Sequence, residues 1–207
     1  MKDSTRQVFD ELYARYPALA SCRGAIDRAF GLLLETVASK GCVFTCGNGG
    51  SASDSEHIVG ELLKKFKKHR DIEGSVAAKL PPGLASKLEG SIAAVSLVSM
   101  SGILTAFAND VAWETAFAQQ LYGLGRAGDT LIALSTSGNS ANCVNAALVA
   151  KAKGLKVVAM TGAGGGRLAG VADATIAVPE TETYKIQEFH LPVYHALCAA
   201  LEEETFS

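Results

Sequence analysis

The 207-residue sequence has no long hydrophobic run, no paired cysteines and no excess of charge of either sign. No apolar stretch continues for 18 residues, which argues against a membrane-spanning helix. The 19 basic residues nearly balance the 21 acidic ones, unlike the balance in proteins that mainly bind nucleic acid. Residues 1–4 carry charge but do not begin a signal peptide. These absences favour a cytoplasmic protein that binds neither nucleic acid nor membranes.

The five cysteines are scattered, and no two of them form a Cys-x-x-Cys pair. Disulfide frameworks and thiolate zinc sites need closer, paired spacing, so the pattern predicts reduced thiols in the interior. Hydrophobic residues make up 48 % of the chain, which is enough for one well-buried core. The cysteines are Cys22, Cys42, Cys46, Cys143 and Cys198.

Helical and extended patterns alternate along most of the chain. Apolar residues three and four positions apart predict helices over 4–20 and 23–39, which form an N-terminal segment, residues 1–40. Short strands alternating with helices predict an α/β fold, a five-stranded parallel sheet in a three-layer αβα sandwich over 41–207. The whole chain, 1–207, is expected to be one domain. The predicted strands are 42–46, 91–97, 130–134, 156–160 and 174–178.

One segment breaks this alternation. Residues 71–90 contain Pro81-Pro82-Gly83 and mixed charge, and they connect a helix to a strand. Long connections of this kind are either surface loops or flaps over a site, and the sequence leaves both interpretations open. No linker divides the chain, and no repeat of fixed period is present.

Two loops that follow strands favour anion binding. Residues 47–51, Gly-Asn-Gly-Gly-Ser, place backbone N–H groups before a helix whose N-cap is expected at Ser51 or Ser53. Residues 135–140, Ser-Thr-Ser-Gly-Asn-Ser, bring hydroxyl groups to the start of another helix. In open parallel sheets, ligands bind beyond the carboxyl ends of the strands. Without the lysine of a P-loop, the two loops suit a phosphate monoester better than a nucleoside triphosphate.

The first loop also matches part of a dinucleotide-binding fingerprint, Gly47-x-Gly49-x-x-Ala52. That fold requires an acidic residue about twenty positions further on, at the end of the second strand. Here the corresponding region, residues 64–70, is a basic helix end. The sequence therefore disfavours a nicotinamide cofactor.

A possible metal site combines two predicted helices. His57 and Glu61 are four residues apart, so their side chains share one helix face. Gln187 and His195 lie roughly 80° apart around the final helix, at about 100° per residue. Two histidines, a carboxylate and an amide oxygen are a credible ligand set for zinc. A solvated helix face is the alternative interpretation.

Together these motifs resemble the phosphoheptose isomerases of the SIS (sugar isomerase) domain family. The resemblance runs from about residue 3 to residue 205 and includes the loops 47–51 and 135–140, His57 with Glu61, and Ile186-Gln187-Glu188-x-His190 with His195. It implies the conversion of D-sedoheptulose 7-phosphate to D-glycero-D-manno-heptose 7-phosphate, a step toward lipopolysaccharide or other surface glycans. It also implies a homotetramer with shared active sites, one zinc ion per subunit, and use of the 1–40 segment in oligomer packing.

The resemblance further implies roles for individual residues. Glu61 is expected to be the base that moves a proton between C1 and C2 through an enediol, with His195 as its acid/base partner. A carboxylate that binds zinc tightly is a poorer base, so two roles compete at Glu61. The implied metal ligands are His57, Glu61, Gln187 and His195. The implied substrate-binding residues are Asn48, Gly49, Gly50, Ser51, Glu61, Lys65, Asn109, Asp110, Ser135, Thr136, Ser137, Ser140 and Gln187.

Three positions depart from the family pattern. Tyr184 stands where an aspartate is expected, Lys65 stands where arginine is common, and Pro192 lies inside the final helix.

Two other functions compete with that of an isomerase. Some relatives are adaptors that bind the replication initiator, but they lack equivalents of Glu61 and His195, which are both present here. Sugar-phosphate sensors of this family are usually fused to a DNA-binding domain, and no basic helix-turn-helix segment precedes residue 40. The enzyme interpretation is favoured over both.

Overall fold

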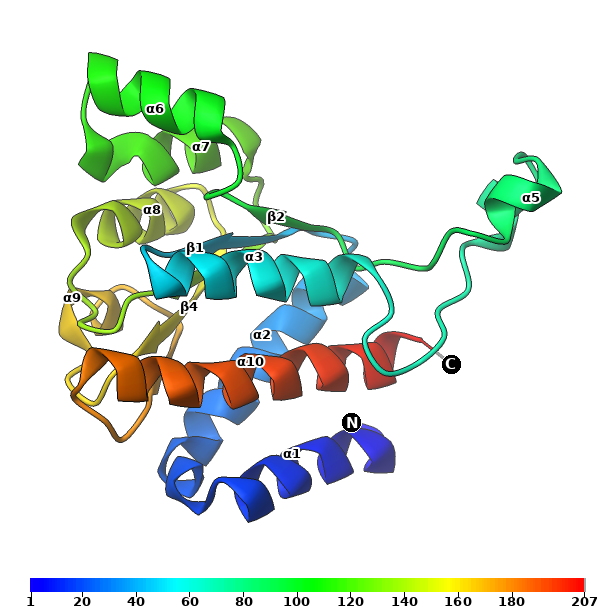
Figure 1. Ribbon diagram of the computed structural model, residues 1–207, viewed down its shortest axis with the longest axis horizontal. Coiled ribbons are helices and arrows are strands. Elements are labelled where there is room, and N and C mark those ends of the chain that lie inside the picture. Colours follow the sequence, from blue (N-terminus) through cyan, green and yellow to red (C-terminus); the bar gives the residue numbers. More distant parts are fainter. Residues whose placement is uncertain (207) are drawn as a thin grey trace.

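The computed structural model describes residues 1–206 and contains one parallel sheet with helices on both faces (Figure 1). The strands lie in the order β2-β1-β3-β4-β5, and each neighbouring pair is parallel. The predicted five-stranded αβα sandwich is therefore confirmed. The strands are β1 (Val43–Cys46), β2 (Ala94–Ser96), β3 (Thr130–Leu134), β4 (Lys156–Thr161) and β5 (Ala174–Ala177).

Two groups of long helices form the outer layers. The first group is α2 (Arg23–Ala38), α3 (Gly50–Leu63) and α10 (Thr183–Thr205), with α1 (Asp3–Arg15) packed on α10. The second group, on the other face, is α6 (Ser101–Asp110), α7 (Ala116–Leu124) and α8 (Ala141–Ala152). No helix in residues 1–206 is long and apolar enough to cross a membrane. The short helices are η1 (Pro17–Cys22), α4 (Gly74–Ala77), α5 (Pro82–Ala85), η2 (Trp113–Thr115) and α9 (Gly166–Ala169).

The strand side chains alternate between two cores. In β4, Val158 and Met160 pack with the α2, α3 and α10 side, whereas Val157 and Ala159 pack with the α6 to α8 side. Because both faces are covered, most strand residues are hydrophobic, which makes the strands recognisable in the sequence. The five cysteines are free, and all except the half-buried Cys42 are buried, as predicted.

Three local expectations were wrong. The helix predicted over 4–20 ends at Arg15, because Tyr16 precedes Pro17 and the proline ring disfavours helical geometry there. The second strand is only Ala94–Ser96 rather than residues 91–97. Neither Ser51 nor Ser53 caps α3, since the helix begins at Gly50 and no side chain bonds to its first N–H groups.

Residues 71–90 form an arm that projects from the body at the end of the molecule opposite the loops that follow the strands (Figure 1). The arm carries α4 and α5, neither of which has a buried residue. Val76, Leu84 and Leu88 are exposed on it. The arm is therefore not a flap over the loops of its own chain, and its exposed apolar side chains are not part of either hydrophobic core of the chain.

A buried ion pair ties the loop after α3 to the last turns of α10. Arg70 Nε donates to Glu202 Oε1 over 2.7 Å, and the two side chains are 0 % and 1 % exposed. Arg70 also donates to the carbonyl oxygens of Glu61 and Leu62, at the end of α3. Glu202 in turn accepts backbone N–H groups from three consecutive residues, Phe66, Lys67 and Lys68.

We expect Arg70→Met to lower the free energy of unfolding by about 3–5 kcal/mol, because it leaves the Glu202 carboxylate buried without its counterion. Urea denaturation followed by circular dichroism would measure this loss. Lys156→Met is the matched control, because it breaks the surface pair between Lys156 and Glu35. The expected loss of unfolding free energy is only about 0–1 kcal/mol. Equal losses of unfolding free energy in the two variants would show that the buried Arg70–Glu202 pair stabilises the protein no more than the surface Lys156–Glu35 pair.

Glu202 also makes stability depend on pH. Burial alone would raise the pKa of this carboxyl, but the N–H groups of Phe66 and Lys67 together with Arg70 outweigh burial and hold the pKa below its usual value. The stabilisation is therefore complete above the unfolded-state pKa of about 4.3 and is lost as the pH falls further. In urea titrations from pH 6 to pH 3, the gap in unfolding free energy between wild type and Glu202→Gln should narrow. The corresponding gap for the surface variant Glu35→Gln should be small throughout.

Candidate active site

The sheet order creates a crevice between the carboxyl ends of β1 and β3. In a sheet of order 2-1-3-4-5, neighbouring connections leave in opposite directions at this point, and ligands bind there. The glycine loop (residues 47–51) follows β1, and the serine loop (residues 135–140) follows β3. A reciprocal pair of amide hydrogen bonds joins the glycine loop to α8, the helix that follows the serine loop, since Asn48 and Asn142 each donate to the other over 2.9 and 2.8 Å. The two loops predicted to bind phosphate are therefore neighbours.

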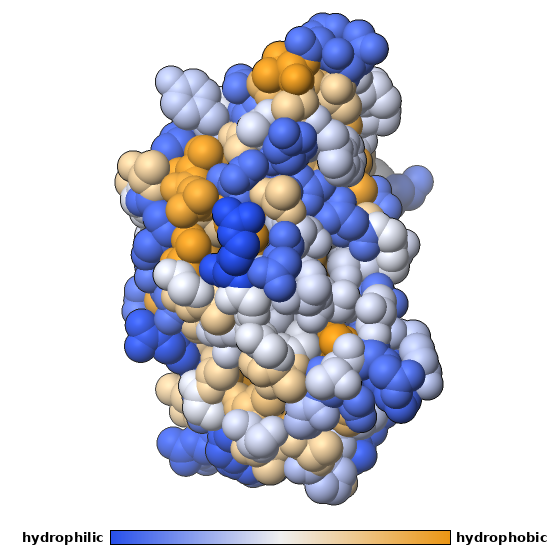
Figure 2. Space-filling model, turned by 90° about the vertical axis from the view of Figure 1, so that its left-hand side faces the viewer, coloured by the Kyte–Doolittle hydropathy of each residue, from blue (hydrophilic) through white to orange (hydrophobic). Residues whose placement is uncertain are grey.

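The serine loop is held in a compact turn. The hydroxyl groups of Ser135 and Ser140 lie 2.9 Å apart, and Ser137 Oγ accepts the backbone N–H of Asn139. Gly138 has a φ of 66°, and a Cβ there would lie 2.0 Å from the carbonyl oxygen of Gly165. Only glycine fits this position. Figure 2 views this edge of the sheet, and much of the middle of the face is pale, as loops of glycine, serine and threonine would be.

The glycine loop meets the start of α10. Gly49 has a φ of 57°, which favours glycine, and α3 begins directly after it. A Cβ on Gly50 would lie 2.7 Å from Nε2 of Gln187, so the glutamine amide rests against the loop backbone. Ser51 is buried beneath the loop. Of the predicted substrate residues, Gln187 is thus placed with the glycine loop.

Further along the same two helices, three predicted site residues come together. His57 Nε2 lies 3.1 Å from Glu61 Oε1 and 3.5 Å from His195 Nε2. The Glu61 side chain is 12 % exposed and that of His57 is 42 % exposed, so the group opens to solvent on one side. Burial lowers the pKa of the His195 imidazole, His57 lowers it further, and Glu61 opposes them. At neutral pH His195 is therefore held in its neutral form.

The donor atoms of this group are of the types that zinc binds. A tetrahedral zinc ion bound at about 2.0–2.1 Å keeps its donor atoms roughly 3.3–3.4 Å apart, and the two contacts of His57 lie on either side of that separation. Within residues 1–206, however, no three His, Cys, Asp or Glu side chains are grouped closely enough to hold a metal ion. Gln187 precedes His195 by two helical turns and lies against Gly50. Of the four predicted ligands, His57 contacts both Glu61 and His195, whereas Gln187 lies apart from them.

Behind His57 lie two polar residues that the sequence analysis missed. The hydroxyl group of Tyr194 lies 2.9 Å from His57 Nδ1 and donates to Asp54 Oδ1 over 3.2 Å. Burial raises the pKa of the Asp54 carboxyl, while the Tyr194 hydroxyl and His57 oppose the rise. Burial also raises the pKa of Tyr194, and the nearby Asp54 carboxylate raises it further. The spacing of Asp54 and His57, three residues apart on one helix face, was the available signal.

Other predicted substrate residues lie elsewhere. Lys65 Nζ pairs with Glu89 Oε1 at 3.4 Å, at the base of the arm, whereas Lys64 Nζ contacts Glu61 Oε2 at 3.2 Å. Asn109 and Asp110 are exposed at the end of α6, where the amide of one donates to the carboxylate of the other. Within the described chain, Lys65, Asn109 and Asp110 therefore have partners other than His57, Glu61 and His195.

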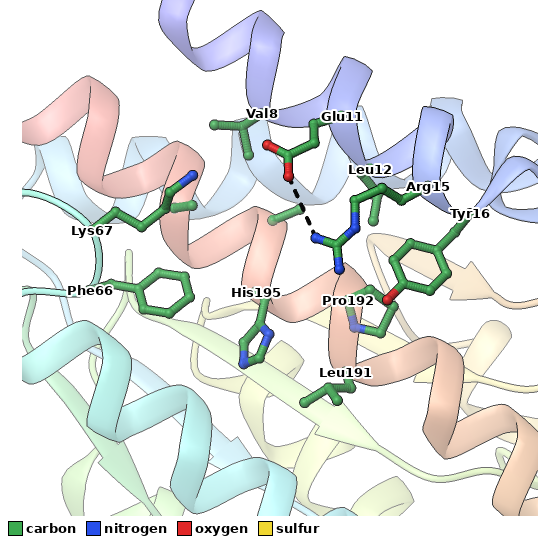
Figure 3. A pocket seen from close by; sticks show the side chains of 12 residues that line it. Val8, Glu11, Leu12, Arg15, Tyr16, Phe66, Lys67, Leu191, Pro192 and His195 are labelled. Carbon is green, nitrogen blue, oxygen red and sulfur yellow. Dashed lines mark ion pairs between the residues drawn. The ribbon is translucent and has the colours of Figure 1, made fainter.

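A groove of about 460 Å³ runs between α1 and α10, and His195 forms part of its wall (Figure 3). Glu11 and Arg15 form an ion pair on the α1 side, at 3.5 Å. The remaining walls are largely apolar and aromatic, with Pro192 on α10 and Phe66 on the loop after α3. His195 therefore borders the groove while its Nε2 faces His57.

Comparisons with known proteins identify the family of the chain. The SIS domain model matches residues 9–162. The phosphoheptose isomerase of Akkermansia muciniphila is 39 % identical over 92 % of this chain and 91 % of its own, and that of Rhodospirillum rubrum is 39 % identical over 98 % of both. The structure of the Neisseria gonorrhoeae phosphoheptose isomerase, 31 % identical, superposes with a TM-score of 0.74 over 96 % of this chain and 98 % of its own. The chain therefore belongs to the SIS domain family and, within it, to the phosphoheptose isomerase family of isomerases.

Proposed function

We propose that the protein interconverts D-sedoheptulose 7-phosphate and D-glycero-D-manno-heptose 7-phosphate. The observation that carries this proposal is the meeting of Glu61 and His195 around His57, on the two helices whose first turns meet at the glycine loop. A carboxylate and a neutral imidazole at one position are the groups that an aldose–ketose isomerisation needs. The family relatives named above, all phosphoheptose isomerases, support the substrate.

In the proposed mechanism, Glu61 takes a proton from the carbon next to the sugar carbonyl. The electrons of the broken C–H bond form the enediol double bond, and the carbonyl oxygen receives a proton from His195. Glu61 then gives its proton to the former carbonyl carbon, C2. His195 recovers a proton from the hydroxyl group on C1, which becomes the aldehyde of the aldose. Because Glu61 is only 12 % exposed, exchange of its proton with solvent is slowed between the two steps.

The two loops would hold the phosphate. The N-termini of α3 and α8 point backbone N–H groups toward the crevice, which favours an anion. The hydroxyl groups of Ser135, Ser137 and Ser140, together with Thr136, supply further donors there. Asn48, Gly49, Gly50 and Ser51 would line the other side. Binding of the phosphate orients the sugar chain and takes no part in the proton transfers.

A zinc ion, one per subunit, would be held by His57, Glu61, Gln187 and His195. When bound, it would supply a positive charge that polarises the sugar carbonyl. The carboxylate of Glu61 serves best as a base when one of its oxygens stays free. Its Oε1 faces His57 and its Oε2 accepts from the exposed Lys64, so Oε2 can act as the base only when Lys64 releases it.

Purified protein is expected to form the aldose from D-sedoheptulose 7-phosphate, followed by NMR with and without added zinc. Glu61→Gln should lower kcat by about 10²–10⁴-fold, because it removes the base and keeps the shape of the side chain. Glu56→Gln is the matched control on the same helix, where the carboxylate contacts Ser99, and it should retain activity. Absence of turnover under every metal condition, with the substrate still bound, would contradict the proposal and indicate a sensor or an adaptor.

We further propose a homotetramer in which residues 1–40 of the single domain, 1–207, contribute to subunit packing. The groove between α1 and α10 leaves Leu191 exposed and Val8 partly exposed, and the arm leaves Leu84 and Leu88 exposed. Apolar surface of this kind is commonly covered by another subunit. A second copy at the groove would also border His195, consistent with active sites shared between subunits.

Light scattering should give a mass four times the 21.5 kDa of one chain. Leu191→Glu is expected to lower that mass, because it places a charge on the rim of the groove. Leu148→Glu changes an exposed leucine on α8, outside the groove, and should leave the mass unchanged. A monomeric wild type would contradict the packing role of residues 1–40 without affecting the assignment of the reaction.

A further inference from the structure

A chain of polar contacts leads from the interior to His57. Asp54 and His57 lie on the same face of α3, three residues apart, and Tyr194 reaches both from α10. Tyr194 is 1 % exposed. Its ring meets His57 edge-on at 5.5 Å and 74°, and meets His195 at 4.9 Å and 82°. One buried side chain thus contacts both histidines of the candidate site.

The direction of these hydrogen bonds follows from the count of protons. A tyrosine hydroxyl group has a single proton, and the structure directs it to Asp54 Oδ1. The hydroxyl oxygen is then left to accept, so the contact with His57 must be donated by Nδ1–H. A neutral imidazole carries one N–H, and with the proton on Nδ1 the Nε2 atom presents a lone pair.

That lone pair faces two other electron-rich atoms. Glu61 Oε1 lies 3.1 Å from His57 Nε2, and His195 Nε2 lies 3.5 Å from it. Three acceptors facing one another would repel, so in the metal-free protein the proton among them is the one on His195 Nε2, and a metal cation would take its place. The arrangement behind His57 therefore prepares its Nε2 atom to bind a cation.

We propose that Tyr194, held by Asp54, is a positioning residue that keeps His57 in the Nδ1–H tautomer with Nε2 directed into the site. For the metal ion this inference rests on the proposed function, whereas the tautomer is a property of the protein alone. Outer partners that orient a metal-binding histidine in this way typically change metal affinity 10–100-fold when removed. The alternative is that Tyr194 only satisfies Asp54 and has no influence on His57.

The tautomer can be measured without metal or substrate. In the metal-free wild type labelled with ¹⁵N-histidine, long-range ¹H–¹⁵N correlation spectra at pH 8 should show His57 with a protonated Nδ1 and an unprotonated Nε2. Tyr194→Phe keeps the ring contacts and removes only the hydroxyl group, so His57 should change to a mixture of tautomers. Asp54→Ala is the second variant: it frees the Tyr194 proton to bond to Nδ1 and should move His57 toward the Nε2–H form.

Zinc binding provides the second readout. Titration of zinc alone against a chromophoric chelator should give a Kd about 10–100-fold weaker for Tyr194→Phe than for wild type. Adding Asp54→Ala to Tyr194→Phe should weaken binding little further, because both residues act through one chain of contacts. Tyr13→Phe is the matched control, since it removes another buried tyrosine hydroxyl group, one that has no hydrogen-bond partner in the described residues. It should leave both the His57 spectrum and the zinc Kd unchanged.

The results separate this inference from the proposed function. An unchanged His57 spectrum in both Tyr194→Phe and Asp54→Ala would overturn the positioning role, whatever the activity of the enzyme. A changed spectrum in a protein whose wild type binds no zinc would support the positioning role and remove zinc from the proposed mechanism. Thermal unfolding of each variant checks that the spectra come from folded protein.

Discussion

Helices α3 and α10 pack side by side and run in the same direction, and their contacts follow one another in order. Gly50 meets Gln187, His57 meets Tyr194 and His195, and the end of α3 is tied by Arg70 to Glu202. A slip of one helix by a single residue, about 1.5 Å, would break every one of these contacts. The Arg70–Glu202 pair resists such a slip, because both charges are buried and every nearby partner is satisfied only in this register.

This packing places different functional groups on the loops after the strands and on the helices. The loops at the crevice between β1 and β3 supply backbone N–H and hydroxyl groups, which suit a phosphate. Residues 47–51 and 135–140 include no carboxylate or imidazole that could take a proton from a carbon atom. The helices supply the carboxylate and the imidazoles. Glu61 lies near the end of α3, where the helix dipole disfavours a negative charge, and Lys64 at 3.2 Å compensates for it. The proposed reaction therefore takes place beside the loops that would hold the substrate.

Much of the fold was predictable because its signals are local. The strands β3 and β4 are buried on both faces, so residues 131–134 and 157–160 are continuously apolar, and the glycine and serine loops follow directly after strands. The failures were also local in origin. Pro17 ended the first helix earlier than its apolar periodicity indicated, and Gly49 took the capping position expected of a serine because the loop needs its positive φ.

The sequence by itself determined the αβα sandwich, the glycine and serine loops after β1 and β3, and the i, i+4 pair of His57 and Glu61, because each depends on residues that are neighbours in the chain. Only the tertiary structure decided that His195 contacts His57, that Tyr194 lies between His57 and Asp54, and that Lys65 turns to Glu89. These contacts join helices more than a hundred residues apart, or a helix end to the arm. Their axial register is set by the packing of the whole core, which no local spacing encodes.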